Sequence, residues 1–299
     1  MSPHNTAPST EGFDSEWLTL RRDADARART ESTEALLHAI ALPGSQKRLS
    51  PLDIVDLGSG SGSNALYLMP NLAASGVHRQ RWVLVDRDAD LLEEAVSALA
   101  EETSRVSETI GATLEIEVST CCVDMATEMD DVPIKGAQLV TASALLDLVS
   151  GHWVTDLSSR LEHFHVGAAL MTLNFDGHVE WSPMEPSHDD KIMAAFHADM
   201  RRDKGFGPAL GSDAVTTFGR ATVKRGTTVQ CFDASWILDD LDTELQERYL
   251  EDIHRTLRGS DVDASLVKEW YERRRRWIDT DESDLVVGHY DILALRAPV

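Results

Sequence analysis

The chain has 299 residues, of which 42% are hydrophobic, and a formal net charge of −23 at neutral pH. This length suffices for one large domain, or a core with additions, around a full hydrophobic core. The strong acidity argues against binding to a nucleic-acid backbone, which requires a basic surface, and against docking on anionic membranes. The dense basic run Arg273–Arg276 lies in a helical pattern, and we interpret it as a solvated helix face.

The N-terminal residues 1–12 are polar and contain Pro, Ser and Thr, which predicts a disordered tail. They have neither the basic nor the apolar part of a signal peptide, and no apolar run approaches the length of a membrane span. The cysteines Cys121, Cys122 and Cys231 form no CxxC pair, which fits free thiols in a reducing compartment. We therefore expect a cytoplasmic protein.

An apolar stripe predicts one helix from Asp14 to about Leu42, which Pro43 and Gly44 end. Apolar strands then alternate with helices, which is typical of a parallel sheet covered on both faces. The elements expected in this series are strand 52–57, helix 63–74, strand 82–85, helix 89–99, strand 113–118, strand 138–142, helix 145–164 and strand 168–173.

The chain after residue 176 has a different pattern, with a helix, a loop rich in glycine and proline, and then a mixture of strands and helices. The elements expected there are helix 191–201, loop 204–211, strand 227–232, helices 241–257 and 264–278, and strand 285–296.

The most informative segment is Asp56–Asn64, with the sequence DLGSGSGSN, which joins a buried strand to the start of a helix. Its glycines allow a ligand to approach the backbone closely, and the helix N-terminus presents free N–H groups. Asp86, at the tip of the next strand, is placed to accept hydrogen bonds from ribose hydroxyls. Asp124 follows the third strand and is placed to accept one from an adenine amino group. The pattern indicates a nucleoside ligand.

A dinucleotide such as NAD is a competing ligand, because the run from Gly60 to Ala65 also satisfies G-x-G-x-x-A. Counted from Gly58, the first glycine after the strand, the third glycine of that motif is replaced by Ser63. Asp56 would also repel a diphosphate, whereas it supplies a counter-charge to a cofactor with an ammonium group. The loop therefore favours a nucleoside that carries an amino acid.

Together these residues resemble the cofactor site of the Rossmann-like (class I) S-adenosylmethionine-dependent methyltransferases of the small-molecule type, over roughly residues 50–175. The resemblance implies a doubly wound α/β fold with a mostly parallel seven-stranded sheet and an antiparallel last strand. It also implies S-adenosyl-L-methionine as cofactor and a small-molecule methyl acceptor. Outside the resemblance, we expect the N-terminal helix and the helical insertions to form a cap over the ligand-binding edge of the sheet. The cofactor-binding residues that the resemblance implies are Asp56, Gly58, Ser59, Gly60, Gly62, Asn64, Asp86, Arg87, Asp124, Met125 and Ser143.

Two residues after the fourth strand are candidates for a catalytic base. Asp147 stands where many small-molecule methyltransferases have His, although an acid stabilised by a helix N-terminus is an equal alternative. His152 is the second candidate, with a plain surface histidine as its alternative. We expect His289 to be structural, and His163 and His165 lack a third ligand for a metal site.

The predicted elements divide the chain into a tail at 1–12, a helical cap segment at 13–46, a cofactor-binding core at 47–175, an insertion or lid at 176–226, and a C-terminal part of the sheet with two inserted helices at 227–299. Trp181, Phe206 and the loop 205–211 are candidate lid elements, or anchors of the insertion to the core.

Several functions stay open at this level. Methyl transfer is the main expectation, with aminopropyl-type transfer, NAD-dependent oxidoreduction or a catalytically silent binding subunit as alternatives. The segment from Ala142 to Leu145 departs from the Asn-Pro-Pro-Tyr type motif of the amide-methylating members, which counts against a nucleic-acid base or protein amide as acceptor. We expect neither nucleic acid nor membrane as a partner, and a homodimer and the acceptor atom remain open.

Overall fold

The computed structural model describes residues 15–41, 50–224 and 227–296, so the predicted tail at 1–12 lies outside the described residues. An eight-stranded sheet has the order β3-β2-β1-β4-β5-β8-β6, with β7 paired to β8. Strands β1 to β5 run parallel, and β8 runs antiparallel to its neighbours β5, β6 and β7. The predicted fold class is therefore confirmed, and β7 is a short eighth strand beside the predicted seven.

The strands are β1 Leu52–Leu57, β2 Arg79–Asp86, β3 Glu115–Cys122, β4 Leu139–Ser143, β5 Ala168–Ser182, β6 Thr227–Asp233, β7 Trp236–Leu238 and β8 Asp284–Arg296. The helices are α1 Ser15–Leu20, α2 Arg22–Ala28, α3 Thr30–Ala41, α4 Ser63–Ala74, α5 Ala89–Ile110, α6 Gly151–His163, α7 Pro186–Met200, α8 Ala214–Val223, α9 Thr243–Thr256 and α10 Ala264–Asp279.

The prediction of a single N-terminal helix is wrong, because the structure has three consecutive helices, α1, α2 and α3, with breaks at Arg21 and Arg29. The backbone hydrogen bonds continue across both breaks: the Asp25 N–H donates to the Arg21 carbonyl at 2.9 Å, and the Thr33 N–H to the Arg29 carbonyl at 3.1 Å. Both arginine side chains are buried. The chain therefore bends where a long cationic side chain turns inward.

The helix expected from Leu145 begins only at Gly151. Ser150 caps it, because its hydroxyl accepts a hydrogen bond from the Trp153 N–H at 3.3 Å. Before the cap, Leu145 and Leu146 are buried in the core and form a turn instead of a helix. Strand β5 is also longer than expected, since it continues nine residues past Leu173 to Ser182.

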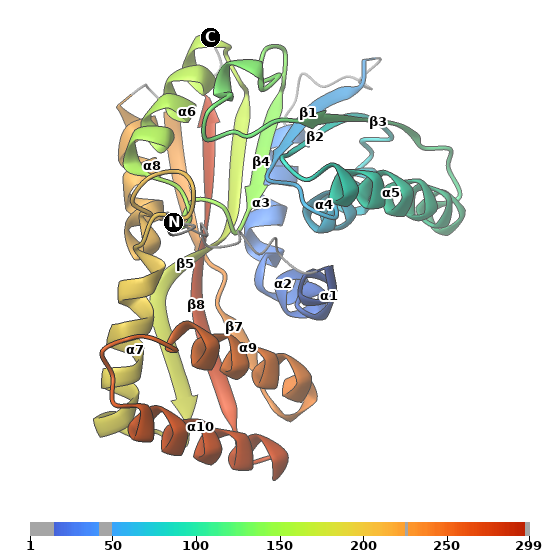
Figure 1. Cartoon of the computed structure of the whole chain (residues 1–299). Coiled ribbons are helices and arrows are strands. Elements are labelled where there is room, and N and C mark those ends of the chain that lie inside the picture. Colours follow the sequence, from blue (N-terminus) through green and yellow to red (C-terminus); the bar gives the residue numbers. More distant parts are fainter. Residues whose placement is uncertain (1–14, 42–49, 225–226, 297–299) are drawn as a thin grey trace, which may run out of the picture.

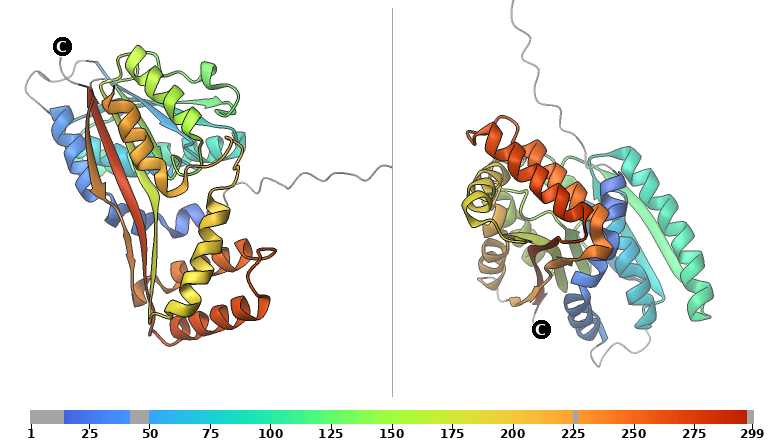
Figure 2. Two further views of the ribbon diagram at one scale, coloured as in Figure 1. Left: turned by 90° about the vertical axis from the view of Figure 1, so that its left-hand side faces the viewer. Right: turned by 90° about the horizontal axis from the view of Figure 1, so that it is seen from below.

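The sheet extends into a second lobe, which Figure 1 shows below the parallel strands. We use the name lower lobe for α7, α9, α10, β7 and the distal ends of β5 and β8. Figure 2 shows α7 beside the long strands, with α9 and α10 packed at their far end. Since β5 is parallel to β1 and β4 and continues into this lobe, the carboxyl ends of the parallel strands face it. A ligand at that edge would therefore lie between the parallel part of the sheet and the lower lobe.

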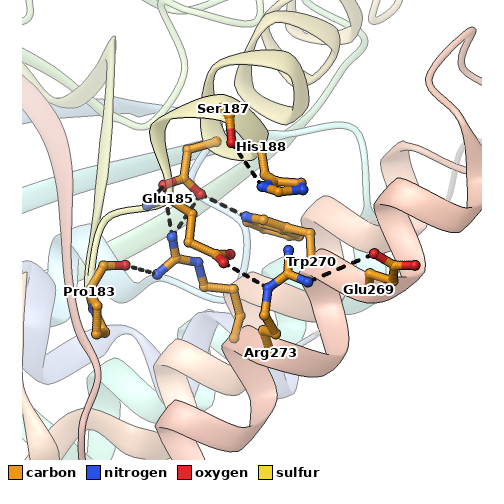
Figure 3. A network of polar contacts seen from close by, with 9 residues as sticks. Pro183, Glu185, Ser187, His188, Glu269, Trp270 and Arg273 are labelled. Carbon is orange, nitrogen blue, oxygen red and sulfur yellow. Dashed lines mark hydrogen bonds and ion pairs between the residues drawn. The ribbon is translucent and has the colours of Figure 1, made fainter.

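The lower lobe has its own aromatic core. Figure 3 shows a network of polar contacts in this lobe, around Glu185, Trp270 and Arg273. The Arg274 guanidinium on α10 is fully buried and donates to both carboxylate oxygens of Asp189 on α7, at 2.7 and 2.8 Å. It also donates to the Pro183 carbonyl, and the Trp270 indole N–H donates to Asp189 at 2.7 Å. Beside it, Arg273 pairs with Glu185 at 2.7 Å. These contacts join α10 to α7 and to the end of β5.

Among the described helices, none is long and apolar enough to cross a membrane.

Candidate functional site

The loop between β1 and α4 lies at the point where the strand order reverses, with β2 on one side of β1 and β4 on the other. In open α/β sheets this is where ligands bind. Gly58, Gly60 and Gly62 all adopt the left-handed region, with φ of +64°, +50° and +84°. A Cβ atom at Gly62 would lie 2.9 Å from the Cβ atom of Ala95 on α5, so helix packing requires the third glycine.

Two apolar side chains cover this glycine loop. A Cβ atom at Gly58 would lie 3.4 Å from Leu145, which follows β4, and one at Gly60 would lie 3.4 Å from Leu18 on α1. The first N-terminal helix therefore reaches over the loop, as expected for a cap.

Asp86 at the end of β2 faces the glycine loop. Its carboxylate accepts hydrogen bonds from the backbone N–H groups of Gly60, at 2.9 Å, and Asp88, at 3.1 Å. The Ser59 N–H donates to the Val85 carbonyl at 3.0 Å, so the loop is tied to β2 at two points. The predicted proximity of loop and acid is present, and an ionised carboxylate retains acceptor capacity beyond these two bonds.

Asp56 is fully buried directly before the loop, and its surroundings were not predicted. Its Oδ1 accepts a hydrogen bond from the side-chain Nδ2 of Asn64 at 2.7 Å, and the side-chain Oδ1 of Asn64 accepts one from Arg29 at 2.8 Å. Burial raises the pKa of Asp56 to about 7, while Asn64 and Arg29 oppose that shift. Its other oxygen, Oδ2, has no hydrogen-bond partner within the described chain.

Arg29 connects the N-terminal helices to this site. Its guanidinium stacks over the Tyr67 ring at 3.9 Å and lies 3.4 Å from the Thr172 hydroxyl on β5. Arginines at helical spacing are usually interpreted as a solvated face, and no local motif distinguishes this one. The contact between Arg29 and Asn64 was therefore not predictable from the sequence.

Asp124 and Met125 follow β3, as predicted. The Asp124 carboxylate accepts a hydrogen bond from the Ala126 N–H at 3.0 Å, which fixes a tight turn. Met125 is buried, and its carbonyl accepts a hydrogen bond from the Trp153 indole at 2.9 Å. Arg87, by contrast, has an exposed side chain, although its backbone lies beside this turn through a contact with Cys122.

Ser143 ends β4, and Asp147 lies in the turn that follows, before α6 begins. The alternative that Asp147 is a helix N-terminal acid is therefore wrong. The carboxyl group is buried, which raises its pKa to about 6, and Arg21 opposes that shift. Its Oδ1 finds no hydrogen-bond partner among residues that the structure describes. A buried carboxyl with one free oxygen and a raised pKa is suited to proton transfer.

The glycine-rich loop of the predicted insertion lies against this turn. The Gly211 N–H donates to the Asp147 carbonyl, and the Leu210 N–H donates to the Val149 carbonyl, both at 2.9 Å. Phe206 packs edge-to-face on Trp153 at 5.8 Å. His152, the second candidate base, has an exposed side chain on α6 and does not share the burial of Asp147.

The carboxyl ends of β1, β2 and β3 and the turn after β4 thus place Asp56, Asp86, Asp124 and Asp147 along one edge of the sheet. Such a row favours a ligand with hydroxyl, amino or cationic groups over a phosphate. Two serine hydroxyls of the loop region, at Ser59 and Ser63, are buried with no partner among the described residues. The site can therefore offer further hydrogen bonds to a bound nucleoside.

No protein-family model and no curated protein matches this chain. Several solved structures are similar in fold. A loganic acid methyltransferase with SAH is 13% identical with a TM-score of 0.48, over 96% of this chain and 98% of that one. A cyclopropane-fatty-acyl-phospholipid synthase-like protein from Lactobacillus casei is 12% identical with a TM-score of 0.47, over 94% and 100%.

A magnesium protoporphyrin IX methyltransferase from Synechocystis with bound SAH is 10% identical with a TM-score of 0.44, over 95% of this chain and 94% of that one. At these identities and TM-scores, the function of this chain has to follow from its own site residues.

Proposed function

We propose that this protein is a class I S-adenosylmethionine-dependent methyltransferase that acts on a small molecule. The observation that carries the proposal is the left-handed glycine loop at the switch point of the sheet, tied to Asp86 through the Gly60 N–H at 2.9 Å. The loop lies beside the acid that would hold the ribose, and Asp124 follows the neighbouring strand β3.

The buried polar atoms fit this cofactor. The free Oδ2 of Asp56 and the hydroxyls of Ser59 and Ser63 are placed around the loop that would hold the amino-acid part, with Gly58, Gly60, Gly62 and Asn64 forming its backbone and support. Asp86 would bind the ribose hydroxyls, and Asp124 and Met125 the adenine. When bound, S-adenosylmethionine supplies a methyl group already activated by its sulfonium.

The protein has to align the acceptor, exclude water and, for a protonated acceptor, remove a proton. We propose Asp147 as that base. It is buried behind the loop 205–211, and its pKa of about 6 leaves the carboxylate ionised at neutral pH. The burial of Asp147, with the Gly211 N–H of the covering loop bonded to its carbonyl, supports a site closed to water.

Binding of S-adenosylhomocysteine, measured by isothermal titration calorimetry, tests the cofactor. We expect Asp86→Ala to weaken binding about 100-fold, because charge-assisted hydrogen bonds to ribose are lost. The matched control is Asp90→Ala, an exposed acid at the start of α5. Tight binding of NAD together with no binding of S-adenosylhomocysteine would contradict the proposal.

Aminopropyl-type transfer uses the same cofactor but a different bond, so product analysis separates it from methylation. With methyl-labelled S-adenosylmethionine, methylation moves the label to the acceptor and releases S-adenosylhomocysteine. Label that stays with the sulfur, with no S-adenosylhomocysteine formed, would favour aminopropyl-type transfer.

A further inference from the structure

Between the parallel part of the sheet and the lower lobe, three buried or half-buried side chains carry a polar atom that lacks a hydrogen-bond partner in the described parts of the chain. They are Asp147 (Oδ1), His197 on α7 (Nε2) and His289 on β8 (Nδ1). Asp147 and His289 are only 6% and 7% exposed. Buried polar groups are almost always satisfied, so a cluster of exceptions from three elements points to a ligand that pairs with them.

These groups lie around Phe175, which is on β5 between its two irregular pairings with β8. The ring centroids of His197 and His289 are 5.9 and 6.2 Å from that of Phe175. A hydrogen bond from the Phe175 backbone acts on the Asp147 carboxyl. One residue of the long strand β5 thus connects the proposed base to both imidazoles.

Aromatic rings surround the same place. Trp236 on β7 lies 4.9 Å from His289 by ring centroids, and Trp17 on α1 lies 6.2 Å from Trp236. Phe196 and Tyr249 continue the wall through edge-on contacts with Phe175 and Trp236. Rings in such arrangements present flat faces and edges that suit another ring.

The charges around the cluster favour an uncharged ligand. Arg21 is already paired with Asp25 at 2.8 Å and stacks 5.1 Å above the Trp236 ring. Burial and Arg21 lower the pKa of His289 to about 3, and burial lowers that of His197, so both imidazoles are neutral at neutral pH. Arg201, which acts on His197, is itself paired with Asp213 at 3.7 Å. The carboxylates of Asp147 and of Asp233, which acts on His289, would repel an anion.

We propose that Asp147, Phe175, His197, Trp236 and His289, here called the acceptor cluster, bind the methyl acceptor, and that this acceptor is an uncharged aromatic or heteroaromatic ring with a hydroxyl or N–H group. A neutral imidazole has one donor and one acceptor nitrogen, so either histidine pairs with a hydroxyl. Asp147 accepts the hydrogen bond of the group to be methylated. That the bound ring is a methyl acceptor rests on the proposed function, whereas the binding of such a ring does not.

The test is calorimetric titration of the whole protein, in the presence of S-adenosylhomocysteine, with three probes: 2-naphthol, its saturated analogue decahydro-2-naphthol, and 2-naphthoate. We expect 2-naphthol to bind about tenfold more tightly than either of the others. Equal affinities of 2-naphthol and decahydro-2-naphthol would overturn the aromatic part of the proposal, and preference for 2-naphthoate would overturn the uncharged part.

The variants His197→Phe and His289→Phe keep a ring but remove its hydrogen bonds, so each should weaken 2-naphthol binding about tenfold. His178→Phe, at an exposed histidine of β5, is the matched control and should bind like the unchanged protein. Full affinity in both cluster variants would overturn the assignment.

Affinity for S-adenosylhomocysteine, measured on the same samples, reports whether each variant is folded. If the unchanged protein binds 2-naphthol but not S-adenosylhomocysteine, the proposed function is overturned and the assignment of the acceptor cluster stands. If it binds S-adenosylhomocysteine but not 2-naphthol, the assignment of the acceptor cluster is overturned and the proposed function stands.

Discussion

Gly62 shows how one atom can determine the geometry of a site. It is the N-cap of α4, in the left-handed region, and its missing Cβ atom lets α5 approach. The sequence predicted the glycine loop because the apolar strand, the repeated glycines and the helix start are all local. It did not predict the contact with Ala95, which depends on how two helices pack.

We expect Gly62→Ala to lower the free energy of unfolding by two separable amounts. The left-handed conformation costs about 1–2 kcal/mol for a residue with a Cβ atom, and the clash with Ala95 adds about 1–3 kcal/mol. Urea denaturation measures the sum. Gly76→Ala, where φ is +93° and nothing lies within 4 Å, should show the conformational cost alone.

In an Ala95→Gly background the clash is removed, so Gly62→Ala should then cost no more than the control. The steric explanation fails if the double variant is as unstable as the two single effects added together.

Asp147 provides a pH test of the proposed mechanism. If its ionised form removes a proton, kcat/KM should rise with pH through an apparent pKa of about 6 and level off above it. Asp147→Asn should lose that limb and about 100-fold in rate. The pKa of His289 is about 3, so this histidine adds no limb in the same range. The measurement is a pH–rate profile, and an unchanged profile in the variant would exclude Asp147 as the base.

At the scale of elements, the sequence predicted strands and helices with strong local signals best. β1 and α4 have the predicted bounds because a buried apolar run meets a glycine turn. β7 has only three residues and no periodicity to detect, and α8 has a sequence rich in Thr that resembles a loop. The role of Arg29 was not predictable either, since its partners Asn64 and Thr172 lie far away in the sequence.

The join between α7 and α10 gives a stability prediction. Asp189→Ala leaves the fully buried Arg274 guanidinium without its counter-charge and should lower the free energy of unfolding by about 3–5 kcal/mol. Asp190→Ala, one residue on and exposed, is the control and should change it by less than about 0.5 kcal/mol. Equal effects, measured by urea denaturation, would show that the ion pair is not what holds the lobe together.

Across the whole molecule, the net negative charge and the buried acids both lower the stability of the fold as the pH rises. The pKa values of Asp56, Asp147 and Asp291 are raised to about 7, 6 and 6, mainly by burial. The folded state therefore holds these protons more tightly than the unfolded state, and the stability that they give is lost as the pH rises through about 6 to 7. His289 has the opposite sign, since its lowered pKa gives stability that is lost as the pH falls from 6.5 towards about 3.

We expect the melting temperature to be higher at about pH 5 than at about pH 8. The three carboxyls outweigh the one histidine, and the net charge of −23 adds repulsion at the higher pH. Adding about 0.5 M NaCl should raise the melting temperature near pH 8 and have a smaller effect near pH 5, because salt screens that repulsion. Scanning calorimetry at both values is the measurement. A melting temperature that falls with salt near pH 8 would mean that surface ion pairs matter more than the net charge.

The position of β8 has a consequence for the synthesis of the chain. It is the last of the described strands to leave the ribosome, yet it lies between β5 and β6 and also pairs with β7. Until it arrives, the long edge of β5 is open to pairing with other chains. The parallel strands can form during translation, but the lower lobe and the proposed acceptor cluster, which includes His289, can be completed only after β8 has been made. A ribosome that stalls before residue 284 would therefore leave a nascent chain with its cofactor loop present and an aggregation-prone strand exposed.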